Sequence, residues 1–211
     1  MILRAADELD ETRPGLPIAD QGAGSPLTGR PASGGQVGGA HATQGTQEGM
    51  TMQARFTHVN LVAQDWRKVA RFYESVLGCV PVPPERNLSG KWLEESTSVR
   101  GAAIRGVHLR LPGWSEGGPT LEVFQYNHEE ERPRTAVNCP GLGHLAFAVD
   151  DVEAACREVL AAGGNAVGKL TSVAGPGAGT VTFITVTDPE GTVIELQHWS
   201  GQSQASAGRE P

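Results

Sequence analysis

The chain has 211 residues, three cysteines and a formal net charge of −7. This length accommodates one domain of ordinary size or two fused small modules, and the acidic balance argues against nucleic acid or an anionic membrane as a partner. The cysteines lack metal-type spacing, so they indicate neither a disulfide framework nor a zinc finger. The sequence contains neither a signal-peptide pattern nor an apolar run of about 18 residues, so we expect a cytoplasmic protein without a membrane segment.

Residues 1–51 differ in composition from the rest of the chain. No aromatic residue occurs before Phe56, and Gly and Pro are frequent. Such a segment buries too little apolar surface to offset its ordering entropy, so we predict a disordered tail over residues 1–51. Met50 and Met52 stand directly before the folded region and offer alternative starts of translation. A second disordered tail is expected over residues 201–211.

A first module is predicted over residues 52–127. Apolar and polar residues alternate with period two from residue 56 to residue 63, which predicts a strand. The period then becomes helical, with Asp65 as N-cap and Gly78 as the stop. Three more strands are expected at Val80–Pro83, Ala102–Leu111 and Thr120–Tyr126. The insert Pro84–Arg100 is expected to form a lid or a pocket wall.

A second module over residues 139–200 repeats this design, after a charged linker at residues 128–138. The segment Gly143–Asp151 corresponds to Thr57–Asp65 at a fixed offset of 86 residues (144 − 58; 151 − 65). After a helix that begins at Asp150 or Asp151 and stops at Gly163-Gly164, strands are expected at Asn165–Gly168, Thr180–Thr187 and Val193–His198. The prediction is an α+β fold of two fused βαβββ modules that form a cleft between their open sheet faces.

Each module carries one histidine near its start and one glutamate in its last strand. These residues are His58 and Glu122, and His144 and Glu195. The alternation places all four on the faces opposite the bulkier apolar residues, and it places Asn60, His108 and Arg110 on the same cleft side. An isolated buried carboxylate is costly, so each glutamate needs a partner.

Two histidines and two glutamates form a mixed nitrogen and oxygen donor set. Such a set suits one divalent ion, namely Zn, Ni, Co, Mn or Fe(II), with positions open to water or substrate. A lone strand histidine or glutamate is usually structural, but equivalent placement in two copies favours ligands. His198 has no counterpart in the first half and is interpreted as structural.

In the pattern of these residues, the chain resembles the vicinal oxygen chelate superfamily, which includes glyoxalase I, bleomycin-resistance proteins and extradiol dioxygenases. The matching segments are the strand that His58 opens, Leu121–Phe124, Gly143–Asp151 and Phe183–Leu196, the last of which contains an Asp-Pro-Glu-Gly turn. The resemblance covers about residues 54 to 199. It implies that His58, Glu122, His144 and Glu195 hold one metal ion, a pattern that is nearest to glyoxalase I.

The resemblance also implies an activity. Proton removal next to a metal-chelated carbonyl, through an enediolate, is expected of a lyase or isomerase similar to lactoylglutathione lyase, with Glu195 or Glu122 as the base. Arg110 and His108 are expected to bind the substrate, Asn60 to orient a ligand, and Trp92 to contribute to a pocket wall. The partners expected are a small-molecule substrate and a second copy in a homodimer. No basic clamp for the glutathione carboxylates can be matched in the sequence.

Three alternative functions remain open, and each differs from this sequence in its usual metal ligands. The first is an isomerase similar to methylmalonyl-CoA epimerases, which usually have Gln in place of Glu122. Ring-cleaving Fe(II) dioxygenases usually keep three ligands. A non-catalytic protein that binds an antibiotic or another small molecule has no use for four metal ligands.

Overall fold

The computed structural model describes residues 53–131, 136–175 and 179–201. All of them belong to the unit Met52–Pro211. The predicted tail over residues 1–51 and, apart from Gly201, the tail over residues 201–211 lie outside the described residues. Part of the predicted linker, residues 132–135, also lies outside them.

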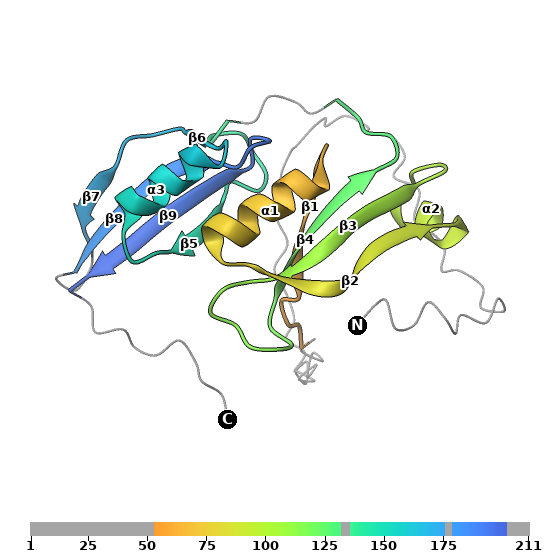
Figure 1. Cartoon of the computed structure of the whole chain (residues 1–211), viewed down its shortest axis with the longest axis horizontal. Helices are drawn as coiled ribbons and strands as arrows, with labels where there is room; N and C mark the ends of the chain where they lie inside the picture. The colour runs from red at the N-terminus through yellow and green to blue at the C-terminus, as the bar shows by residue number, and fades with distance from the viewer. Residues whose placement is uncertain (1–52, 132–135, 176–178, 202–211) are drawn as a thin grey trace, which may run out of the picture. The chain divides into compact units, whose positions relative to one another are not determined.

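The first module contains one four-stranded sheet and two helices (Figure 1). Its elements in chain order are β1 (His58–Val62), α1 (Trp66–Leu77), β2 (Val80–Ser89), α2 (Lys91–Thr97), β3 (Ala103–Arg110) and β4 (Thr120–Tyr126). The strand order is β1-β4-β3-β2, in which β1 and β4 are parallel and the other pairs are antiparallel.

The second module repeats this topology. Its elements are β5 (Leu145–Ala148), α3 (Val152–Ala161), β6 (Asn165–Ala166), β7 (Thr171–Ala174), β8 (Thr180–Thr187) and β9 (Val193–Ser200). The order is β5-β9-β8-β6, and β7 also pairs with β8. Two βαβββ modules therefore follow each other in the chain, and the predicted α+β fold is confirmed.

The helix boundaries follow from capping residues that the sequence shows. Asp65 accepts hydrogen bonds from the backbone N–H groups of Arg67 and Lys68, and the helix ends at Gly78 with φ of 67°. Asp151, rather than Asp150, is the corresponding cap of α3, because its carboxylate accepts from the N–H of Ala154. The inward face of α1 buries Trp66, Val69, Ala70, Phe72, Tyr73 and Leu77. Each large side chain among them contributes about 1.5–3 kcal/mol through burial.

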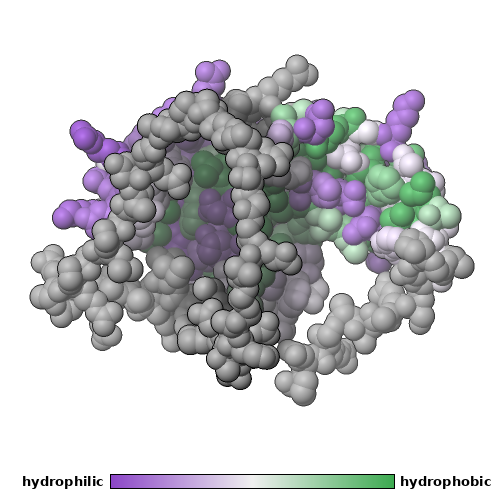
Figure 2. All heavy atoms as spheres, turned by 180° about the vertical axis from the view of Figure 1, so that it is seen from behind, coloured by the Kyte–Doolittle hydropathy of each residue, from purple (hydrophilic) through white to green (hydrophobic). Residues whose placement is uncertain are grey.

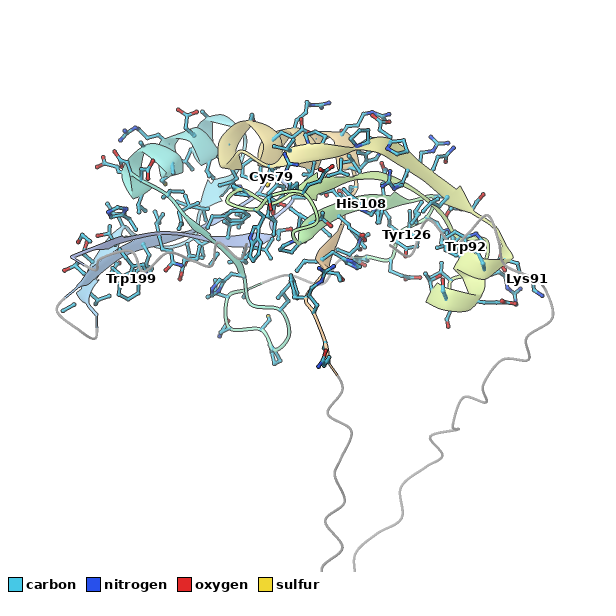
Figure 3. All side chains as sticks on the ribbon, turned by 90° about the horizontal axis from the view of Figure 1, so that it is seen from below. Cys79, Lys91, Trp92, His108, Tyr126 and Trp199 are labelled. Atoms are coloured by element: carbon cyan, nitrogen blue, oxygen red, sulfur yellow. The ribbon has the colours of Figure 1, made fainter. Side chains whose placement is uncertain are left out.

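The apolar core lies between the helices and one face of each sheet. In β1, Leu61 belongs to the buried core cluster and the partly buried Val59 packs against it, and residues of both modules join this cluster. Helices α1 and α3 contact each other and lie on the same side of the two sheets (Figure 3). The opposite faces of both sheets are therefore free of these helices, as the alternation predicts.

The segment Pro84–Arg100, predicted as an insert, contains the second half of β2 and helix α2. Strand β2 continues to Ser89, and its pairing with β3 shifts between Val82 and Arg86. Pro83 and Pro84 fall in this gap, and neither can donate a backbone hydrogen bond to the ladder. Strand β7 was not predicted, because all four of its residues are exposed and show no alternation.

Helix α2 covers part of the open face of the first sheet. Leu93 of α2 packs in a second apolar cluster with Ala102, Ile104 and Phe124. Figure 3 shows α2 on the side of the first sheet opposite to α1. The insert therefore forms an apolar wall on the same face as the predicted metal ligands.

Candidate functional site

One row of polar side chains crosses the open face of the first sheet. In the strand register, Glu122 of β4 is paired with His108 of β3 on one side and with Asn60 of β1 on the other. Paired residues point to the same side of a sheet. The neighbours Leu121 and Val123 are buried in the core, so Glu122 points to the open face.

His58, the first residue of β1, lies close to the Glu122 carboxylate. Its Nδ1 is 3.6 Å from Oε1 of Glu122 and 3.3 Å from Oγ1 of Thr57. The side chain of Glu122 is only 13% exposed. Among the described residues, the basic side chains within ion-pair distance of this carboxylate are His58 and His108.

His108 is the second neighbour of Glu122, and it is not a cation. Its Nε2 lies 3.3 Å from Oε1 of Glu122, yet this buried nitrogen has no hydrogen-bond partner among the described residues. Burial, followed by the charges of Arg86 and His58, lowers the pKa of His108 to about 4. The ring is neutral at pH 7, so its contact with Glu122 is not a salt bridge.

The second sheet places its own pair at equivalent positions. Glu195 of β9 is paired with Ala146 of β5 and with Thr185 of β8, in the same way that Glu122 is paired with Asn60 and His108. His144 stands directly before β5 and is exposed. The ligands predicted from the duplication thus occupy equivalent places, but their neighbours in the adjoining strands differ between the modules.

The donor set fits a divalent cation chemically. Imidazole and carboxylate are its usual ligands. Glu122 holds a nearly buried carboxylate beside two imidazole rings, and a buried nitrogen of His108 lacks a hydrogen-bond partner among the described residues. Within the described residues of one copy, however, no group of three or more His, Cys, Asp or Glu side chains is placed to hold a metal ion. In one copy, His58 and Glu122 belong to the first module, and His144 and Glu195 belong to the second.

A cleft of about 990 Å³ lies between the two modules. Of the predicted site residues, Asn60 and His144 line it, and Lys68 and Tyr126 contribute further polar groups. Its acidic lining residues are Asp65, Glu129, Glu130, Glu131 and Glu190. The remaining predicted site residues are not part of this lining.

Two predicted substrate-binding residues lie away from the cleft. Arg110 is paired with Val80 and Thr120 on the open face and is partly buried. Trp92 on α2 is 40% exposed. Figure 3 shows His108, Tyr126 and Trp92 following one another toward α2.

Two features near the site were not predicted from the sequence. The carboxylate of Glu190 accepts hydrogen bonds from the backbone N–H groups of Gln64 and Asp65, at 2.7 and 2.8 Å, and so joins the second module to the start of α1. The alternation of β2 across the shift places Arg86, paired with Gly106, on the open face near His108. The prolines before Arg86 break the pattern that would have revealed its side.

The sequence and the fold define the family. Residues 55–196 match the Glyoxalase/Bleomycin resistance protein/Dioxygenase superfamily. The chain belongs to this superfamily, and the resemblance stated from the motifs is confirmed.

Two curated relatives are lactoylglutathione lyases by name. A probable lactoylglutathione lyase of Vibrio parahaemolyticus is 48% identical over 157 residues, which cover 74% of this chain and 96% of that protein. The lactoylglutathione lyase of Haemophilus influenzae is 30% identical over 141 residues, which cover 66% of this chain and 88% of that protein. These relatives support a glyoxalase-type function.

The fold is also that of a solved family member. The crystal structure of a glyoxalase family protein from Bacillus cereus matches with a TM-score of 0.61 at 17% identity, covering 72% of this chain and 97% of that one.

Within residues 53–131, 136–175 and 179–201, no helix is long and apolar enough to cross a membrane.

Proposed function

We propose that this protein is a divalent-metal-dependent lyase that isomerises a hemithioacetal of glutathione and a 2-oxoaldehyde into a 2-hydroxyacyl thioester. The observation that carries the proposal is the occurrence of one histidine at the start of the first strand and one glutamate in the last strand of each module, in a chain similar to two lactoylglutathione lyases. His58, Glu122, His144 and Glu195 would hold the ion. Zn, Ni, Co, Mn and Fe(II) all suit these donors.

The reaction moves one proton between neighbouring carbons and a second proton between the oxygens that these carbons carry. A bound divalent ion supplies positive charge that stabilises negative charge developing on two adjacent substrate oxygens. The base takes the proton from the hydroxyl-bearing carbon and returns it to the neighbouring carbon. The former ketone becomes a hydroxyl and the former hydroxyl carbon becomes the thioester carbonyl, so no external oxidant or reductant is needed.

Glu195 is the better base of the two glutamates. Glu122 is nearly buried between two histidine rings, so its carboxylate has little room to move. Glu195 faces Ala146 and Thr185 in its row, and no hydrogen bond or ion pair involves its carboxylate among the described residues. A carboxylate with small neighbours can turn toward a substrate carbon.

The full ligand set is completed in a homodimer. The two pairs lie in different sheets, and both open faces are turned to the side opposite α1 and α3. In the register, Val62, Val80 and Trp199 also lie on these open faces, and they are exposed by 57%, 44% and 37%. Figure 2 shows the molecule from behind, where apolar side chains are visible among polar ones on the second module. A second copy would cover these side chains and bring His58 and Glu122 of one protomer to the other pair of its partner.

Complementation tests the dimer. His58→Ala and His144→Ala should each be inactive, and a refolded equal mixture should recover about a quarter of the wild-type activity, because half of the random dimers carry one intact site. Recovery is absent if each site is built within one copy. A monomer in light scattering across micromolar concentrations would also contradict the dimer.

Activity assays test the proposed reaction. The metal-loaded protein should convert the hemithioacetal to the thioester, while the Glu195→Gln variant should retain metal in part and lose proton exchange at the substrate carbon. Turnover of 2-methyl-3-oxoacyl thioesters or catechols in place of the hemithioacetal would contradict the proposal. Trp92→Ala, Arg110→Gln and Asn60→Ala should raise KM if these residues contact the substrate.

A further inference from the structure

His108 occupies a place that the duplication does not explain. Its counterpart in the register of the second sheet is Thr185, which is paired with Glu195 as His108 is paired with Glu122. At this position of the adjoining strand, a histidine therefore stands beside Glu122 and a threonine stands beside Glu195. Its Nε2 is buried, lies 3.3 Å from Oε1 of Glu122 and has no hydrogen-bond partner among the described residues.

The imidazole is held in position by its surroundings. The ring of Phe124 contacts it edge-on, with 5.6 Å between ring centroids. Phe124 packs in turn on Leu93 of α2 and lies over Gly106, where a Cβ atom would collide with the phenyl ring. A ring packed in this way has little freedom to turn toward a substrate, so its Nε2 remains directed to the region of Glu122.

A buried imidazole nitrogen without a hydrogen-bond partner is unfavourable, and such an exception in a folded protein indicates a functional role. Leaving such a donor unsatisfied costs stability that an apolar ring of the same shape would recover. Carboxylates that bind metal ions are usually held by hydrogen bonds from a second layer of residues. The separation of 3.3 Å between Nε2 of His108 and Oε1 of Glu122 is close to hydrogen-bond length, so a metal-bound Glu122 would accept from the Nε2–H tautomer of His108 without leaving its place.

We propose that His108 is a positioning residue, which fixes the Glu122 carboxylate as a stationary metal ligand through an Nε2–H hydrogen bond. The inference rests on the proposed metal site, and it changes the role of His108 from substrate contact to support of a ligand. It also distinguishes the glutamates: Glu122 is fixed by an imidazole, and Glu195, beside Thr185, is free to move.

Metal affinity of stripped protein tests this role. His108→Phe keeps a ring against Phe124 but removes both nitrogens, and it should weaken Zn²⁺ or Co²⁺ binding about 10-fold to 100-fold in competition with a chromophoric chelator. His108→Gln, which restores an N–H group, should bind within about threefold of wild type if the hydrogen bond is what matters. The matched control is Thr185→Val at the equivalent position, which should leave affinity unchanged.

Thermal unfolding without metal separates support of a ligand from support of the fold. Metal-free His108→Phe should melt at the same temperature as wild type or higher, because a buried unpaired N–H is removed. If this variant does not fold, His108→Leu repeats the test with a smaller apolar side chain.

Several results would overturn the inference. Unchanged affinity in His108→Phe, or an equal loss in Thr185→Val, excludes the positioning role. A lower number of nitrogen ligands in the X-ray absorption spectrum of His108→Phe would make His108 a ligand itself. Wild-type protein that binds no metal in the same titration would refute the proposed function and this inference together.

Discussion

Gly106 is the position in the first sheet where one added methyl group should do the most damage. It lies in the middle of β3, paired with Phe124 of β4. A Cβ atom there would collide with the carbonyl oxygen of Val123 and the ring of Phe124, and would lie 2.9 Å from the Phe124 Cα. Two of these three contacts are backbone atoms of a paired strand, which cannot move without breaking the ladder. Overpacking of this kind costs about 3 kcal/mol, at the upper end of the usual range.

Gly106→Ala should therefore lower the melting temperature by about 6–12 °C, since each kcal/mol corresponds to about 2–4 °C at this chain length. Differential scanning calorimetry and urea titration measure the loss. The control is Gly168→Ala, where an added Cβ has no atom within 4 Å. A Gly106→Ala variant within about 0.5 kcal/mol of wild type would refute the reasoning, because that is the usual range for surface changes.

Burial raises the pKa of the Cys79 thiol to about 12, so at pH 8 alkylating reagents should modify exposed Cys139 quickly and Cys79 only after unfolding. Fast labelling of Cys79 in the native protein would contradict its placement. Glu190→Gln should cost about 1 kcal/mol in urea unfolding, because it weakens two hydrogen bonds to the start of α1. The exposed Glu153→Gln loses a pair with Arg157 and a charge in the first turn of α3, and it should cost a few tenths of a kcal/mol. A fragment that starts at Met52 should keep the melting temperature and activity of the full chain, and a large loss of either would show that residues 1–51 contribute.

The fold was predictable where one face of an element is buried. In β1, the alternation identified Val59 and Leu61 as core residues, and Asp65 and Gly78 marked the limits of α1. Two copies of the same pattern then gave the topology twice. The part of β2 after the prolines was not predictable, because the register shift there depends on pairing with β3.

Of the predicted site, the sheet faces of the residues were predictable from the alternation, but their contacts were not. The duplication predicts that the histidine and the glutamate of each half occupy equivalent places, because the same pattern occurs twice in the sequence. The contact between His108 and Glu122 depends on how the chain between β3 and β4 turns, which the sequence does not specify. The contact of Glu190 with Gln64 joins residues 126 positions apart and has no local pattern.

Metal content of purified wild type and its ligand variants tests the central claim most directly. Elemental analysis should find about one divalent ion per chain in wild type and strongly reduced content in both His58→Ala and His144→Ala, because each variant loses one ligand of a shared site. His198→Ala should match wild type, because the Nδ1 of His198 bonds the carbonyl of Val149 instead. Equal metal content in wild type, His58→Ala and His144→Ala would contradict a shared metal site and the enzymatic function proposed from it.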